Sequence, residues 1–216
     1  FSLGYAALPE GGMQSIPNQF ANDLVPGTVR CNTTVASVQL GAVALSDGTL
    51  LKADEIIVAT EEPAANRLLG LPAPNNFSAR STCCLCFAVQ NPPIREATLV
   101  LNGDGTGPIN NLSFVSFAQP TYAPSGQTLL SVSTVGMVNE SSEELLPKVM
   151  GQLRDWFGDC VSRWQHLRTY RIPYALPNQS PAALACVPPT RIAEGLIRCG
   201  DYCDIASIEG AIRSGL

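Results

Sequence analysis

Charge is scarce in this sequence, and positive charge is the scarcer sign. Charged residues make up 14% of the 216 residues, the formal net charge is −5, and the two lysines are Lys52 and Lys148. A nucleic-acid-binding surface needs clustered basic side chains to neutralise phosphates. No basic stripe of that kind occurs, so we expect no nucleic acid as partner. Because 45% of the residues are hydrophobic, the composition predicts a globular protein with a real core.

Long hydrophobic runs are also lacking. The apolar stretches are short and interrupted, so the sequence predicts no transmembrane segment. The chain begins Phe1-Ser2-Leu3-Gly4-Tyr5 without an initiator Met or a signal-peptide pattern, and it stops at Gly215-Leu216 within the last expected helix. We interpret both ends as those of a fragment of a longer protein.

Histidine is nearly absent, whereas cysteine is not. His166 is the one histidine, and eight cysteines occur. The run Cys83-Cys84-Leu85-Cys86 is too crowded for the usual paired zinc ligands, so no metal is predicted. Most of the cysteines lie in apolar, strand-like surroundings and are expected to be free, buried thiols. His166 is expected to be structural.

The last 22 residues form the most informative stretch. Gly195–Cys199 predicts a short strand, Gly200-Asp201 a turn, and Ala206 or Ser207 the start of a helix with small residues on one side. A helix N-terminus offers unpaired N–H groups and partial positive charge, and the Asp201 carboxylate could accept hydrogen bonds from a sugar-like chain. An ordinary strand, turn and helix closing a sheet would show the same pattern, so both interpretations stay open at this point.

The first third of the chain predicts strands joined by tight turns. Asp47-Gly48 between apolar alternations indicates a hairpin, and a strand is expected over 29–38. The continuous apolar run Ile56–Ala59 is typical of a strand covered on both faces. A helix should follow through Leu69, with Thr60 as its cap.

The middle of the chain predicts an antiparallel sheet and one long helix. Strands are expected over 81–90, 98–102, 112–118 and 129–135, with no intervening helix long enough for a parallel crossover. Residues 140–157 have helical periodicity, with Ser141 or Ser142 as cap and Gly158 as terminator. A further strand is expected over 164–172.

Three segments, in this order, carry a family resemblance. They are Pro9-Glu10-Gly11-Gly12-Met13 before a helix expected over 18–24 with Ser15 as cap, Tyr174-Ala175-Leu176-Pro177, and Gly200-Asp201 followed by Ser207-Ile208-Glu209-Gly210-Ala211. Together they resemble the FAD-dependent amine oxidase superfamily, and within it the phytoene and zeta-carotene desaturase-like flavoproteins. The resemblance covers most of the chain.

The resemblance implies the fold, the cofactor and its contacts. The fold class would be α/β (α+β), an incomplete FAD/NAD(P)-binding flavoprotein fold with an antiparallel-sheet substrate domain. Residues 1–72 and 191–216 would belong to the FAD-binding domain, and residues 73–190 to the substrate-type domain. The contacts with FAD are implied for the adenine, the ribityl-phosphate chain and the flavin edge, at Val35, Thr60, Gly200, Asp201, Ser207, Ile208 and Ala211.

The first flavin motif of that family, Gly-x-Gly-x-x-Gly after a strand, is missing. We expect it to lie before Phe1, which makes this chain a C-terminal fragment and leaves FAD binding by the fragment alone open. No catalytic residue is assigned. Lys52 belongs to the expected hairpin and Lys148 to the long helix, so neither is assigned as a lysine beside the flavin.

Two functions follow as hypotheses. The first is an FAD-dependent oxidoreductase that dehydrogenates an apolar small molecule, since the strands of the middle segment carry few charges. The alternative is a non-catalytic structural or assembly subunit of a larger complex that retains the flavoprotein fold and contacts other protein subunits. The resemblance implies a plastid (chloroplast) location, with the cytoplasm as the other expectation.

Overall fold

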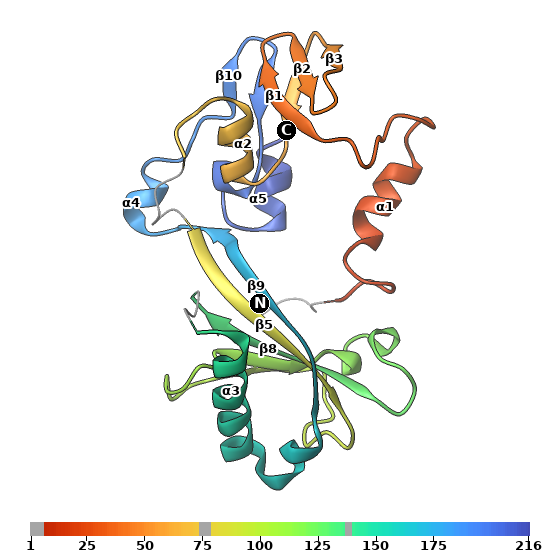
Figure 1. The fold of residues 1–216 in the computed structure, drawn as a ribbon, viewed down its shortest axis with the longest axis vertical. Helices are drawn as coiled ribbons and strands as arrows, with labels where there is room; N and C mark the ends of the chain where they lie inside the picture. The colour runs from red at the N-terminus through yellow and green to blue at the C-terminus, as the bar shows by residue number, and fades with distance from the viewer. Residues whose placement is uncertain (1–6, 74–78, 137–139) are drawn as a thin grey trace. The chain divides into compact units, whose positions relative to one another are not determined.

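The protein is described from a computed structural model, in residues 7–73, 79–136 and 140–216. The chain divides into two compact units, unit 1 from residues 1–29 and 81–173, and unit 2 from residues 30–80 and 174–216 (Figure 1). The boundaries expected after 72 and 190 differ from these. The N-terminal segment groups with unit 1 because Tyr122 Oη and Gln119 Nε2 donate to the carbonyls of Pro9 and Leu8, at 3.1 and 3.3 Å.

Unit 1 is built on a five-stranded sheet in the order β6-β7-β8-β5-β9. The pairs β6/β7, β7/β8 and β8/β5 are antiparallel, as the sequence predicted. The strand expected over 112–118 ends at Phe114, because a 3₁₀ turn over Val115–Phe117 follows it. The strands of this sheet are β5 Ala79–Val89, β6 Leu99–Leu101, β7 Asn111–Phe114, β8 Thr128–Val135 and β9 Gln165–Pro177.

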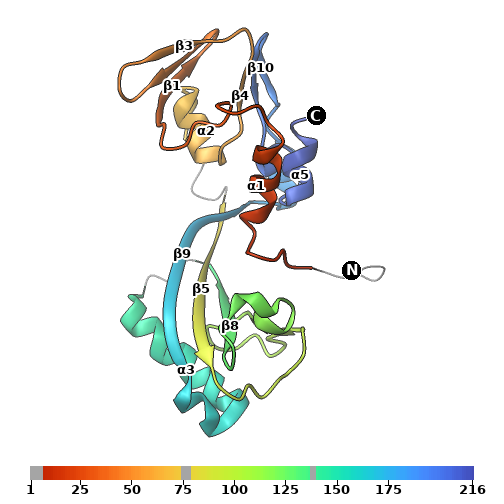
Figure 2. The ribbon, with the colours of Figure 1, turned by 90° about the vertical axis from the view of Figure 1, so that its right-hand side faces the viewer.

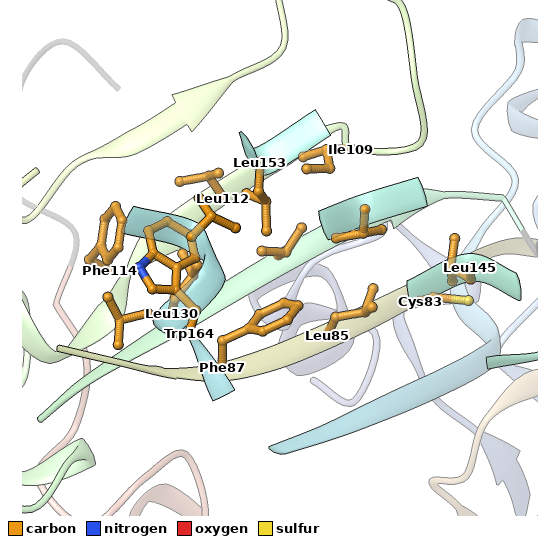
Figure 3. Close-up of a cluster of buried hydrophobic side chains, with 14 residues drawn as sticks. Cys83, Leu85, Phe87, Ile109, Leu112, Phe114, Leu130, Leu145, Leu153 and Trp164 are labelled. Carbon is orange, nitrogen blue, oxygen red and sulfur yellow. The ribbon is translucent and has the colours of Figure 1, made fainter. Parts of the chain in front are cut away.

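The helix α3, Ser142–Phe157, covers one face of this sheet. Alternate side chains of β5, among them Leu85 and Phe87, point toward the helix residues Leu145 and Leu153 (Figure 3). All four are fully buried. The apolar side chains that recur at every second residue of β5 therefore pack against those that recur at helical spacing along α3. The ring of Trp164 belongs to the same core.

The start of α3 is held by a capping box, as expected from the sequence. The Ser141 hydroxyl accepts a hydrogen bond from the Glu144 amide, and the Glu144 carboxylate accepts one from the Ser141 amide at 2.8 Å. The backbone hydrogen bond from Ser141 lowers the pKa of Glu144. Gly158 ends the helix with a positive φ of 74°.

We expect a Ser141→Ala variant to lose about 1 kcal/mol of unfolding free energy, the usual cost of removing a hydroxyl cap. Because the pKa of Glu144 is lowered by folding, its contribution is present above the ordinary carboxyl pKa and is lost as pH falls through the lowered value. Denaturation at neutral and acid pH tests both points, with Ser142→Ala as the matched control that leaves the cap bond in place. Equal losses in the two variants would contradict the assignment of Ser141 as the cap.

Unit 2 contains an antiparallel meander and a second small sheet. The meander is β1 Val35–Gln39, β2 Ala42–Leu45 and β3 Leu50–Lys52, separate from the sheet that contains β4 and β10 (Figure 2). The expected hairpin is confirmed, and the Thr49 amide donates to Asp47 Oδ1 at 2.8 Å. The strand expected from residue 29 begins at Val35.

The second sheet of unit 2 has the order β10-β11-β4, with β10 Arg191–Ala193, β11 Leu196–Arg198 and β4 Ile56–Val58. Ile56 and Val58 are buried in a cluster with Ala65 of the helix α2, Glu62–Leu68. Ile57 is 57% exposed, so the expectation that this strand is covered on both faces is wrong for this chain. The reason is that alternate side chains of β4 point to opposite faces of the sheet, and only the face of Ile56 and Val58 packs against α2.

The remaining helices are short. They are α1 Ser15–Asn22, α4 Pro181–Leu184 and α5 Ile208–Arg213, with 3₁₀ turns over Pro120–Tyr122, Gly158–Arg163 and Asp201–Cys203. Gln14, not Ser15, precedes α1 as its N-cap, so the predicted cap is wrong. The Ser15 hydroxyl instead donates to the carbonyls of Glu10 and Gly12 and stabilises the preceding turn.

All eight cysteines are free thiols, as predicted. Cys83 is fully buried, whereas Cys31 and Cys186 are exposed. The prediction that the thiols are buried is therefore correct for only some of the eight cysteines. His166 is partly buried, lies against the ring of Phe87 and shares a 2.9 Å hydrogen bond with the Thr169 hydroxyl. These contacts agree with a structural histidine.

Candidate functional site

The site is organised by two parallel strands of unit 2 that end side by side. In the register of β4 and β11, Val58 is paired with Arg198, and the Cys199 amide donates to the Val58 carbonyl at 3.0 Å. Thr60 lies two residues after Val58, and Gly200 lies two residues after Arg198. The strand pairing therefore brings these two predicted positions to the same edge of the sheet. Ligands of open α/β sheets bind outside the carboxyl ends of the strands, which is this edge.

A pocket of about 70 Å³ lies beside this edge, within unit 2. Glu62 at the start of α2 and Asp201 and Asp204 after β11 give it carboxylate oxygens, and Tyr202 lines it with them. Since one water takes about 30 Å³ in the liquid, the pocket accommodates a polar group of a ligand. The segment 177–188, which contains α4, forms the other side.

The polar groups of the pocket are unequally satisfied. Tyr174 donates from its hydroxyl to Glu62 Oε2 at 3.0 Å, and Arg213 Nε lies 3.3 Å from Asp204 Oδ2. Tyr202 is only 5% exposed, and its buried hydroxyl has no hydrogen-bond partner. A buried hydroxyl left without a partner costs about 1–3 kcal/mol, so this atom indicates a position where a ligand's polar group would be stabilised.

Burial shapes the electrostatics of the pocket. Desolvation raises the pKa of the Asp201 carboxyl above its usual range. Desolvation also raises the pKa values of Tyr174 and Tyr202, and the negative charge of Glu62 adds to both. Both phenols are therefore neutral donors at neutral pH, beside carboxylates that act as acceptors.

Helix α5 presents the other predicted contacts. Ser207 is its N-cap, as expected, and its hydroxyl accepts the Gly210 amide at 2.9 Å. The first helical residue, Ile208, is 64% exposed, and Ala211 is partly buried. A Cβ at position 210 would lie 2.0 Å from the Ile205 carbonyl oxygen, so glycine is required where the turn folds back on the helix.

The end of β11 and the N-terminal end of α5 are separated by the length of α5. Gly200 donates its amide to Ser214 Oγ at 2.8 Å, which attaches the C-terminal end of α5 to the strand end. Ser207 lies seven residues before Ser214, which at 1.5 Å for each residue places it about 10 Å further along. The structure thus groups Thr60, Gly200 and Asp201, with Ser207 and the amides of α5 at the far end of the same helix.

Val35 and Thr60 differ in detail from the sequence expectations. Val35 begins β1 and packs its partly buried side chain against the cluster that contains Ile56 and Val58, and the adenine contact implied for its backbone stays a prediction. Thr60 is exposed, and Glu61 takes the N-cap position of α2, so the predicted cap role of Thr60 is wrong. The physical reason is that α2 begins later, at Glu62-Pro63.

Three site residues were missed by sequence reasoning. Glu62 and Tyr202 were not singled out, because their meeting depends on the pairing of β4 with β11. Arg198 is also buried, and its Nε and Nη1 donate to the carbonyl of Pro189 and to Asn66 Oδ1, at 2.9 and 3.3 Å. A lone arginine inside an apolar strand was the available signal, because charged residues are seldom buried without partners.

The residues present fit a flavin nucleotide at this edge. Asp201 offers a carboxylate, and Tyr202, whose buried hydroxyl has no hydrogen-bond partner, also lines the pocket. At Gly200 a Cβ would lie 2.4 Å from the Tyr202 ring, so glycine lets the ring pack against the strand end. Acceptors for ribityl hydroxyls therefore exist where the strand pairing predicts the ligand.

Fold and site together define a nucleotide-binding flavoprotein architecture. The sequence profile of the family described as flavin-containing amine oxidoreductase matches residues 3–216. The chain therefore belongs to that family, whose members contain a flavin, and FAD is the cofactor that this membership implies. The expected superfamily, mixed α/β fold class and cofactor are confirmed. None of the curated proteins matches the chain significantly.

Solved structures share the fold. A protein from Exiguobacterium sp. 255-15 assigned as a protoporphyrinogen oxidase has a TM-score of 0.70 at 18% identity, covering 95% of this chain and 49% of that one. An oxidoreductase from Methanosarcina mazei has a TM-score of 0.63 at 18% identity, covering 83% and 46%. Reduced UDP-galactopyranose mutase has a TM-score of 0.69 at 15% identity, covering 89% and 46%. The chain thus spans about half the length of these proteins.

Within 7–73, 79–136 and 140–216, no helix has both the length and the apolar character needed to cross a membrane. In the same part of the chain, no three side chains of His, Cys, Asp or Glu are placed to share a metal ion.

Proposed function

We propose that the protein containing this chain is an FAD-bound oxidoreductase that dehydrogenates an apolar small molecule. The observation that carries the proposal is the parallel register of β4 and β11, which sets Thr60 and Gly200 at one sheet edge. Asp201 and Tyr202 line the adjoining pocket, and the buried Tyr202 hydroxyl has no partner. The family membership supports the cofactor. Neither the strand register nor the family membership identifies the substrate, so the apolar substrate class is a further part of the proposal.

Each residue of the site has a proposed part in binding. Asp201 accepts hydrogen bonds from ribityl hydroxyls, and the Tyr202 hydroxyl pairs with a further polar atom of the same chain. The start of α5, from Ser207 to Ala211, lies along an electron-rich ring edge, with the amides of Ile208 and Glu209 toward it, because the Gly210 and Ala211 amides already donate to Ser207. The backbone of Val35 meets the adenine. When bound, FAD accepts a hydride or two electrons from the substrate. The residues described here orient it and exclude water.

The apolar substrate is supported by the open face of the unit 1 sheet. On the face opposite α3, the register aligns Cys84, Ser133 and Asn111 in one row and Cys86, Ser131 and Ser113 in the next. None of these side chains carries a formal charge at its ordinary pKa. A surface of small, neutral side chains suits an uncharged ligand better than an ionic one.

The flavin content of the natural full-length protein tests this proposal. We expect the purified protein to show a flavin absorption spectrum and to release FAD in stoichiometric amount on denaturation. A colourless protein that takes up no added FAD would overturn the proposal. That result would favour the other hypothesis, a structural subunit of a larger complex. The plastid location and the protein partners stay predictions.

An assay with substrate classes tests the second half of the proposal. With uncharged apolar substrates, anaerobic mixing should bleach the flavin spectrum as the cofactor is reduced. Carboxylated or phosphorylated analogues of the same carbon skeleton are the matched comparison, and we expect them to reduce the flavin more slowly. Faster reduction by the charged analogues would contradict the apolar substrate class while leaving FAD binding intact.

A further inference from the structure

Arg198 is a buried cation at the end of β11, and the proposed function assigns it no part. Its exposed fraction is 7%. Buried charges are normally paired with an opposite charge, yet Arg198 forms no salt bridge with any of the described residues. Its side-chain partners are two neutral oxygens, the carbonyl of Pro189 and Asn66 Oδ1, at 2.9 and 3.3 Å. These two partners belong to opposite walls of the pocket beside Asp201.

The bond to Asn66 fixes the face of α2 that lines the pocket. Glu62 and Asn66 are four residues apart, so their side chains lie on one face of the helix, one turn from each other. Glu62 lines the pocket, whereas Asn66 is buried. Asn66 Nδ2 also donates to the Pro72 carbonyl at 3.0 Å, so both ends of this amide are hydrogen-bonded. The position of α2 at the strand end therefore depends on Asn66 and on Arg198.

The bond to Pro189 fixes the other wall of the pocket. Residues 177–188 supply that wall, and Pro188, which lines it, directly precedes Pro189. The backbone of Arg198 contacts the same segment, because its amide donates to the Thr190 carbonyl at 2.8 Å. Arg198 thus holds the end of this wall through its amide and through its guanidinium.

A guanidinium is suited to joining two walls from a single side chain. Its N–H donors stand in a rigid, planar fork, and here Nε is used for one wall and Nη1 for the other. A lysine carries one ammonium on a flexible stem, so it keeps the charge and loses the fixed geometry of the fork. The substitution Arg198→Lys therefore separates the geometry of this side chain from its charge.

We propose that Arg198 is a positioning residue for FAD, which holds α2 and residues 177–188 in the arrangement that the cofactor pocket requires. The inference rests on the proposed function, because it takes this pocket to hold part of FAD. Arg198 does not itself line the pocket, so it acts through the two walls. Walls that are held in place before binding need less ordering when the ligand arrives, which raises the affinity.

The first test compares FAD binding by Arg198→Lys and by the full-length parent, with Arg191→Lys as the matched control. Arg191 is an exposed arginine on the neighbouring strand β10. In a titration of the apoprotein we expect Arg198→Lys to bind FAD about tenfold more weakly, the effect of about 1.4 kcal/mol, and Arg191→Lys to bind it like the parent. If the parent binds FAD and Arg198→Lys binds it equally well, the inference is wrong and the proposed function stands.

Hydrogen exchange of the same apoproteins separates positioning from a general loss of stability. The amides of Leu184 and Ala185 donate to the Ser180 and Pro181 carbonyls within the wall that contains α4. We expect these amides to exchange about tenfold faster in Arg198→Lys, through local opening of the wall, while those of the β1–β2 hairpin in the same unit keep the parent's rates. Unchanged exchange in α4, or equally faster exchange in the hairpin, would overturn the inference. Because this measurement needs no FAD, failure of the positioning role is distinguishable from failure of FAD binding.

Discussion

An Asp201→Ala variant of the full-length protein is expected to bind FAD about 10- to 100-fold more weakly than the parent. A hydrogen bond to an ionised carboxylate contributes about 1.5–3 kcal/mol, and each 1.4 kcal/mol changes the dissociation constant tenfold. Asp201 lies in the pocket at the end of β11, beside the buried Tyr202 hydroxyl. The measurement is titration of the apoprotein with FAD, followed by the quenching of flavin fluorescence.

The matched control is Asp204→Ala, which removes a carboxylate from the same pocket. Asp204 is paired with Arg213 at 3.3 Å, so we expect it to affect FAD affinity less than Asp201 does. Because burial raises the pKa of Asp201, the parent should also lose affinity as pH falls through that raised value, and Asp201→Ala should not. Equal affinities of the parent and Asp201→Ala would contradict the assigned role.

A Phe87→Ala variant is expected to lose about 3–5 kcal/mol of unfolding free energy, the usual cost of truncating a buried aromatic ring. Phe87 is fully buried in the core between the unit 1 sheet and α3 (Figure 3). Its removal leaves a cavity beneath Leu130 and Trp164 of the same cluster. Chemical denaturation of the full-length protein, monitored by tryptophan fluorescence, measures the loss.

The matched control for Phe87 is Leu101→Ala on the edge strand β6. Leu101 is 67% exposed, and substitutions at exposed positions usually change stability by less than about 0.5 kcal/mol. A loss from Phe87→Ala no larger than that from Leu101→Ala would contradict the placement of Phe87 in the core.

Local patterns were the most successful sequence predictions. The cap, apolar stripe and terminating glycine of α3 all follow from interactions within a few residues of each other, and the structure has each of them. The same holds for the Asp47-Gly48 hairpin. Of the two residues expected to begin the last helix, Ala206 and Ser207, the structure has Ser207 as its N-cap. Predictions that depended on which other helix or strand packs against an element were less accurate. Ile57 was expected to be covered because an apolar run does not show that its strand lies at the edge of a sheet.

The candidate site was only partly visible in the sequence. Asp201 and the start of α5 belong to one contiguous stretch, so their motif could be recognised. Glu62 and Tyr202 are 140 residues apart in the sequence (202 − 62). They line the same pocket because β4 pairs in parallel with β11. No local signal reports such a pairing, since strand partners are chosen by packing of the whole unit.

The sequence by itself determined the family, the order of strands and helices, and the presence of an acid and a helix cap in its last residues. These depend on residue types at short spacings, which act through turn, cap and period preferences. Only the tertiary structure decided that Thr60 and Gly200 share a sheet edge, that the Tyr202 hydroxyl is buried without a partner, and that Arg198 joins Asn66 to Pro189. The physical reason is that side chains far apart in sequence are brought together by strand register and burial.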